Sequence, residues 1–157
     1  MIKIGHGYDS HRYEDGEYII IGGVKISSKR AIVAHSDGDI LIHALCDALL
    51  GAVGKGDMGS YYDSSEKYKN IDSTIFLQEI MQIVYSGGYS IINIDATVVT
   101  EEPAISKHAI KIKKSLSKIL KINEEQINIK SKSNEKLGYV GRKEGIEVHV
   151  ILLIEKI

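Results

Sequence analysis

The sequence predicts an α/β (α+β) fold, a β-sheet with helices packed on one face. Segments in which apolar residues alternate, as in half-buried strands, occur near both ends and in the middle of the chain. Segments with apolar residues three or four positions apart, as in amphipathic helices, lie between them. The chain has 157 residues, 43% of them hydrophobic, and shows no compositional break, so we expect one domain spanning residues 1–157.

The N-terminal third is predicted to start as β structure. Residues 2–5 and 18–26 are rich in β-forming residues. Gly22 and Gly23 interrupt the second run and tolerate the positive φ angles that a tight hairpin turn requires. We therefore expect a hairpin at this pair.

A first helix is predicted to begin near Ser36 and to run to about Leu49. The apolar residues of this stretch follow helical spacing, and Ser36 with Asp39 forms an approximate capping box. Residues 51–70 are rich in glycine and polar residues and show neither the helical nor the strand spacing of apolar residues, so we expect a loop. Long loops in compact domains are often functional.

A second helix and a central strand are predicted next. Asp72 is a good N-cap for a helix whose apolar side includes Ile75, and Gly87 with Gly88 ends it. Apolar residues at every second position between residues 92 and 98 then indicate a strand, with Ile92 on its inner face.

A third helix is predicted after Pro103, with apolar positions between residues 105 and 120 on one side and lysines around much of the rest. A lysine-rich face can bind nucleic acid, but this segment lacks interleaved aromatic residues. The net charge of the chain is only -1. Both observations favour a solvated face, and we expect no nucleic-acid partner.

Two more strands are predicted, a short one at Ile127 and Ile129 and a long one over residues 146–154. Ile151 and Leu153 make the second face of the last strand apolar as well. A strand that is apolar on both faces is covered on both, and in a chain of this size a second subunit can supply that cover. No stretch has the roughly 18 apolar residues of a membrane span, so we expect a cytoplasmic protein with no membrane partner.

Two clusters have the residue types of a metal site. Asp9 and His11 are two positions apart, so on a strand their side chains point to the same side and can reach one metal ion. His43 lies on the first predicted helix, with Asp39 and Asp47 four residues to either side. It is either a surface histidine paired with an acid or a metal ligand oriented by one. Two histidines and a carboxylate can hold zinc and leave one position open for substrate.

Three polar segments are compatible with phosphate chemistry. His35 and Ser36 precede the first helix, where backbone N–H groups can bind a phosphate or where Ser36 simply caps the helix. Residues 57–59 and Asp63 lie in the long loop, where ordinary turn chemistry also explains them. Residues 131–145 combine hydroxyls, a carboxylate, cations and glycines, which suits either a phosphate with a divalent cation or an exposed hairpin loop.

Together these segments resemble one family over the whole chain, the 2-C-methyl-D-erythritol 2,4-cyclodiphosphate synthases of the non-mevalonate isoprenoid pathway. The resemblance rests on six motifs that occur in the family order, and it overturns the surface reading of His43. The motifs occupy residues 4–11, 20–24, 34–39, 43–51, 56–59 and 135–145.

The resemblance implies a lyase acting by intramolecular phosphoryl transfer. The substrate, 4-diphosphocytidyl-2-C-methyl-D-erythritol 2-phosphate, closes on itself to form the cyclodiphosphate and releases CMP. Its own 2-phosphate is the nucleophile, so no general base is required, and catalysis depends on positioning and charge stabilisation. The resemblance further implies that Asp9, His11 and His43 bind zinc, and that Glu135 binds a second divalent cation, magnesium or manganese.

The resemblance also implies the remaining site residues and the assembly. His35 and Ser133 match positions that stabilise the transition state, and residues 100–107 match the cytidine pocket. Family members are homotrimers whose active sites are shared between subunits. The substrate-binding set implied in this way is Asp9, Ser10, His11, His35, Ser36, Asp57, Met58, Gly59, Tyr62, Asp63, Thr100, Pro103, Ala104, Ile105, Lys132, Ser133, Asn134, Glu135, Tyr139 and Arg142.

The chain departs from the family pattern at several positions. Ala104 stands where a lysine is usual, and Lys132 replaces a usual threonine, so we hypothesise that Lys132 supplies the missing charge. Arg142 and Glu144 fall in a stretch that lines a cavity at the trimer axis in relatives. Two other functions remain open, a metal-dependent phosphohydrolase in which the metal activates water, and a nucleotide-binding module without turnover.

Overall fold

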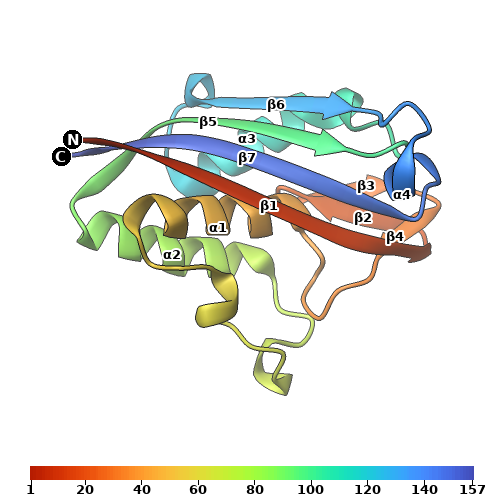
Figure 1. The fold of residues 1–157 in the computed structure, drawn as a ribbon, viewed down its shortest axis with the longest axis horizontal. Coiled ribbons are helices and arrows are strands. Elements are labelled where there is room, and N and C mark those ends of the chain that lie inside the picture. Colours follow the sequence, from red (N-terminus) through yellow and green to blue (C-terminus); the bar gives the residue numbers. More distant parts are fainter.

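A computed structural model of the chain describes all residues from 1 to 157, and Figure 1 shows a sheet with helices on one of its faces. The strands are β1 (Ile2–Asp15), β2 (Tyr18–Ile21), β3 (Val24–Ser27), β4 (Arg30–Ile32), β5 (Tyr89–Val99), β6 (Ile127–Lys132) and β7 (Gly145–Lys156). The helices are α1 (Ile40–Val53), α2 (Ser73–Ser86), α3 (Ala109–Leu120) and the single turn α4 (Gly138–Gly141). Single 3-10 turns occur at Met58–Ser60, Glu66–Tyr68, Ile105–His108 and Glu124–Gln126.

The main sheet has the strand order β4-β1-β7-β5-β6. Only the β5–β6 pair is parallel, and the other pairs are antiparallel. The separate β2–β3 hairpin turns at Gly22 and Gly23, whose φ angles are +60° and +79°, so the predicted hairpin is confirmed. Because β5 lies between β6 and β7, residues 131–145 do not form the hairpin loop that was one interpretation of that segment.

The core lies between the sheet and the helices. Every second residue of β7 from Ile146 to Ile154 is fully buried on the helix side, whereas Ile151 on the other side is 48% exposed. The predicted α/β fold with helices on one face is therefore confirmed. None of the helices is long and apolar enough to cross a membrane.

The first helix begins later than its sequence suggests. Asp39, not Ser36, is the N-cap of α1, and its side chain accepts a hydrogen bond from the backbone N–H of Ile42. The buried carboxylate also accepts from the N–H groups of Gly22 and Gly23, at 2.8 and 2.7 Å. Asp39 therefore joins the start of α1 to the β2–β3 turn, a tertiary contact that local spacing does not reveal.

Two strands also differ from the prediction. The strand expected over residues 2–5 continues to Asp15, because β1 pairs with β7 along most of its length. In β5 an irregularity between Ile91 and Asn93 shifts the alternation, so Ile91 is buried in place of Ile92. Helix α2 has the predicted N-cap Asp72, but its residue Ile75 is 42% exposed.

Helix α1 lies unusually close to β1. A Cβ atom added to Gly5 would lie 2.0 Å from the carbonyl oxygen of Ala48, and one added to Gly7 would lie 1.7 Å from that of Ala44. Only glycine permits this approach of a helix backbone to a strand. The contact brings the His43 turn of α1 next to Asp9, two residues beyond Gly7 on the same face of β1.

We predict that Gly7→Ala separates α1 from β1. The new methyl group cannot occupy the space of a backbone carbonyl, so the helix must shift at a cost of about 3 kcal/mol in the free energy of unfolding. Urea unfolding measures this loss. Gly51→Ala in α1 is the matched control, because nothing lies within 4 Å of a Cβ added at that position. The control should be neutral or up to about 1 kcal/mol more stable; equal destabilisation by both changes would contradict the prediction.

Candidate functional site

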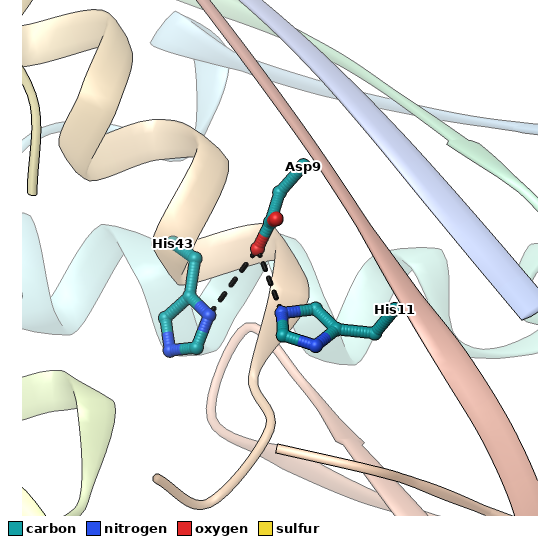
Figure 2. Close-up of side chains that lie close together, drawn as sticks. All are labelled: Asp9, His11 and His43. Atoms are coloured by element: carbon teal, nitrogen blue, oxygen red, sulfur yellow. Dashed lines mark hydrogen bonds and ion pairs between the residues drawn. The ribbon is translucent and has the colours of Figure 1, made fainter. Parts of the chain in front are cut away.

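Asp9, His11 and His43 converge on one point between β1 and α1 (Figure 2). The Asp9 Oδ2 atom lies 2.9 Å from His11 Nε2 and 3.3 Å from His43 Nδ1. One ligand atom from each residue lies within 4.8 Å of the other two. The structure thus contains the candidate metal-binding site that the sequence predicted.

The strand and the helix contribute different parts of this site. The alternation of β1 places Asp9 and His11 on the side that faces the helices, as their spacing predicted. Their direct partners on β7 are Val148 and Ile146, which are also buried against the helix layer. His43 reaches the pair from the first turn of α1 and is positioned by the close contact of that helix with β1.

The histidine orientations fit a bound metal ion. His11 Nδ1 lies 3.1 Å from the carbonyl oxygen of Val33, which can only accept, so Nδ1 carries a proton, and Nε2 is the nitrogen that faces the site. His43 presents Nδ1 to the site, and its Nε2 contacts hydroxyl groups on the other side. Two imidazole nitrogens and a carboxylate oxygen are a usual ligand set for zinc.

The charges at the site stabilise one another. Burial alone would raise the pKa of Asp9, but hydrogen bonds and charge attraction from His11 and His43 outweigh it and lower that pKa to about 2. Burial likewise opposes the protonated form of His11. Its hydrogen bond to Asp9, the charge of Asp9 and the Val33 carbonyl nevertheless raise the pKa of His11.

The site opens into a pocket of about 170 Å³. His11 and His43 of the metal site line this pocket directly. Aromatic side chains form one wall, in which the Tyr62 and Phe76 ring centroids are 4.3 Å apart. The lining residues are His11, Ala34, His35, Ser36, His43, Met58, Tyr62, Asp63, Ser64, Tyr68 and Phe76.

Several predicted site residues therefore lie beside the metal site. His35 and Ser36 line the pocket, and His35 Nε2 donates to the Ser65 carbonyl oxygen at 2.7 Å. Met58, Tyr62 and Asp63 line it from the long loop. Asp57 and Gly59 belong to the adjoining 3-10 turn, where the Asp57 side chain accepts from the N–H of Ser60. Ser10 is exposed on the opposite side of β1 from Asp9.

A second group of predicted site residues lies elsewhere, at the ends of β5 and β6. None of the residues from 132 to 135 lines the pocket. The carbonyl oxygen of Lys132 accepts from the N–H of Thr100, which places the strand end beside residues 100–107. The Glu101 side chain accepts from the N–H groups of Asn134 and Lys136 and so holds the loop that carries Ser133 and Glu135.

The remaining predicted residues differ in their exposure. The side chains of Thr100 and Ile105 are buried within the chain, Thr100 with its hydroxyl bonded to Tyr13. Pro103 and Ala104 are accessible on the segment between them. Tyr139 donates to Glu147, and Arg142 donates to Glu144 at 3.0 Å.

Comparison with known proteins identifies the family. Residues 2–155 match the model of the YgbB family. The chain is 49% identical over 154 residues to 2-C-methyl-D-erythritol 2,4-cyclodiphosphate synthase of Francisella tularensis, covering 97% of each chain. It is 42% identical over 154 residues to the enzyme of that name from Azotobacter vinelandii, covering 98% of each.

The chain belongs to the YgbB family. Its fold matches IspF of Plasmodium falciparum in complex with CDP with a TM-score of 0.88 and 37% identity, covering 99% of this chain and 96% of that one. The bifunctional IspDF of Campylobacter jejuni matches with a TM-score of 0.96 and 35% identity. The alignment with IspDF covers all of this YgbB-family chain but only 43% of the longer IspDF chain.

Sequence reasoning missed residues that organise this YgbB-family site. Ser73 contacts His43 and donates to Asp37, and Glu101 holds the loop of Ser133 and Glu135. Asp37 falls within the motif of residues 34–39, although no role was assigned to it, and no local motif marks Ser73 or Glu101 as functional.

We predict that Asp9 stabilises the zinc-free protein in a pH-dependent way. Because the pKa of Asp9 is lowered from 3.8 to about 2 in the folded state, its contribution is present above about pH 4 and is lost as the pH falls towards 2. In chelator-treated protein, the stability difference between wild type and Asp9→Asn should shrink by about 2 kcal/mol between pH 5 and pH 2.5. Denaturant unfolding at each pH tests this; a constant difference would contradict it.

Proposed function

We propose that this chain converts 4-diphosphocytidyl-2-C-methyl-D-erythritol 2-phosphate to 2-C-methyl-D-erythritol 2,4-cyclodiphosphate and CMP. The observation that carries the proposal is the Asp9, His11 and His43 site beside its pocket, in a chain that aligns end to end with synthases of that name. The substrate's 2-phosphate attacks the β-phosphorus, and the bond from that phosphorus to the CMP oxygen breaks.

The metal ions belong to this proposal. Zinc fits the nitrogens of His11 and His43 with the Asp9 carboxylate. Glu135 is exposed and accepts one hydrogen bond from the Ser133 hydroxyl, and its carboxylate is of the type that holds magnesium or manganese. Bound divalent ions supply Lewis acidity and neutralise the charge that develops on the phosphate oxygens.

The chain's own residues provide positioning and charge stabilisation. His35 and Ser36 line the pocket, His35 with its ring oriented by the Ser65 carbonyl oxygen and Ser36 with a hydroxyl donor suited to the diphosphate. Met58, Tyr62 and Asp63 form the wall where the methylerythritol would lie. None of these groups needs to act as a base, because the attacking phosphate is already anionic at neutral pH. The pocket therefore has no need of a catalytic dyad.

A homotrimer is the assembly that this proposal favours. Residues 132–135 and the accessible part of residues 100–107 lie outside the pocket of their own chain, so a neighbouring subunit is the natural source of the cytidine-binding and second-metal residues. The outer face of the sheet also exposes apolar side chains, with Ile4 at 67% and Ile151 at 48%. Packing against other copies would bury them. A cytoplasmic location remains a prediction.

We predict that zinc-loaded protein releases CMP and the cyclic product from the diphosphocytidyl substrate. His43→Ala should lower the rate by at least about 100-fold, because it removes one of three metal ligands. Phosphorus NMR with quantification of CMP distinguishes the alternatives. Inorganic phosphate as the product would indicate a phosphohydrolase, and binding of CMP without turnover would indicate a nucleotide-binding module.

The departures at Ala104 and Lys132 generate a second test. Lys132 is exposed beside Thr100, so its ammonium group can serve the nucleotide that a lysine at position 104 would otherwise contact. We expect Lys132→Thr to weaken CMP binding about 10-fold, the size of one charge-assisted contact, and Ala104→Lys in that background to restore it. Calorimetry measures both. Unchanged affinity in Lys132→Thr would refute the compensation, and Lys130→Thr is the control on the same strand.

A further inference from the structure

A chain of hydrogen bonds through the buried Ser73 leads from the partly buried Asp37 to the metal site. The Ser73 hydroxyl lies 2.9 Å from His43 Nε2 and donates its proton to Asp37 Oδ1. The N–H of Ser73 donates to the other Asp37 oxygen at 3.0 Å. Ser73 is fully buried at the start of α2, so its hydroxyl has no water as an alternative partner.

The number of protons available determines which group donates in the bonds among Asp37, Ser73 and His43. A carboxylate can only accept, so the single hydroxyl proton of Ser73 is committed to Asp37. The Ser73 oxygen is then available to His43 only as an acceptor. His43 must therefore carry a proton on Nε2.

This requirement selects the state of the ring that a metal needs. A neutral imidazole has one N–H and one lone pair, so a proton on Nε2 leaves the lone pair on Nδ1. Nδ1 is the atom that faces Asp9, at 3.3 Å, and belongs to the candidate metal site (Figure 2). In the opposite tautomer, Nδ1–H would donate to the Asp9 carboxylate, and a metal ion could bind this nitrogen only after displacing that proton.

We propose that Asp37 and Ser73 are positioning residues that hold His43 as its Nε2–H tautomer, with Nδ1 prepared for metal binding. The proposal rests on the proposed function only in taking Asp9, His11 and His43 as the metal site. Metal-bound histidines usually donate their second nitrogen to a carboxylate or carbonyl group, and here a serine hydroxyl relays that interaction from Asp37.

Ser36 is the natural comparison, because its hydroxyl lies 3.0 Å from the same nitrogen of His43. It accepts a long 3.3 Å bond from the N–H of Gly38 and has no carboxylate to receive its own proton. Its hydroxyl can therefore donate to or accept from His43 and selects neither tautomer. Ser36 is also partly exposed to the pocket, whereas Ser73 is not.

The test measures two quantities that do not depend on turnover. The first is the zinc dissociation constant, from competition with a chromophoric chelator. The second is the set of ¹⁵N shifts of the His43 ring in zinc-free protein, which report the tautomer directly. The variants are Ser73→Ala, which removes the acceptor, and Asp37→Asn, whose amide can donate to Ser73 and free the hydroxyl proton to turn towards His43.

We expect Ser73→Ala and Asp37→Asn to weaken zinc binding by about 10–100-fold, as loss of such outer partners usually does. The Nδ1–H tautomer should appear in Asp37→Asn. Ser36→Ala should retain both the affinity and the tautomer. Ser117→Ala, which removes a serine hydroxyl bonded to the Ile122 carbonyl oxygen away from the site, controls for a general loss of stability.

The outcomes separate this inference from the proposed function. Wild-type affinity in both Ser73→Ala and Asp37→Asn, or an Nδ1–H tautomer in the wild type, overturns the positioning role and leaves the metal site intact. If instead His43→Ala binds zinc as tightly as the wild type does, the metal site itself is wrong and the positioning role falls with it. Should the Asp37 and Ser73 variants fail to fold, the wild-type ¹⁵N shifts still decide the tautomer.

Discussion

The contact between α1 and β1 is the constraint on which the rest of the structure depends. Gly5 and Gly7 let the carbonyl groups of Ala48 and Ala44 approach the strand to a distance that no other residue permits. Because the interior is close-packed, this spacing also determines where the side chains beyond it meet. Asp9 and His43 come from elements distant in sequence, and this backbone contact places them together.

Two carboxylates, the buried Asp39 and the partly buried Asp37, hold the segments around the site in place. Asp39 ties the start of α1 to the β2–β3 turn, and Asp37 ties the preceding loop to the start of α2. Each accepts hydrogen bonds from backbone N–H groups, so the end of the loop that follows His35 and Ser36 is anchored both to the β2–β3 turn and to α2. A pocket whose chemistry consists of positioning phosphates requires walls of this kind, since misplaced donors stabilise no transition state.

The separation of the predicted site residues into two groups is the reason we propose a site shared between subunits. The pocket residues surround the metal site, whereas Ser133 and Glu135 lie on a loop that Glu101 holds beside the nucleotide segment. Helices cover one face of the sheet only, and the outer face carries Ile4 and Ile151 in solvent. Shared sites and a covered outer face are consequences of the same proposed assembly.

Periodicity predicted the three long helices, most of the strands and the shared side of Asp9 and His11, because these depend on residues near one another in sequence. It did not predict β4 or the full length of β1. It failed at Ser36, because the N-cap is Asp39, whose side chain also binds the N–H of Gly23, 16 residues earlier in the chain. It failed as well at Ile92, where the β5 irregularity reverses the alternation. The meeting of His43 with Asp9, and the hold of Ser73 on His43 across 30 residues, exist only in the packed molecule. Residue types and spacing therefore marked Asp9 and His11 as candidate ligands and left His43 open, while packing between distant segments brought the three side chains together.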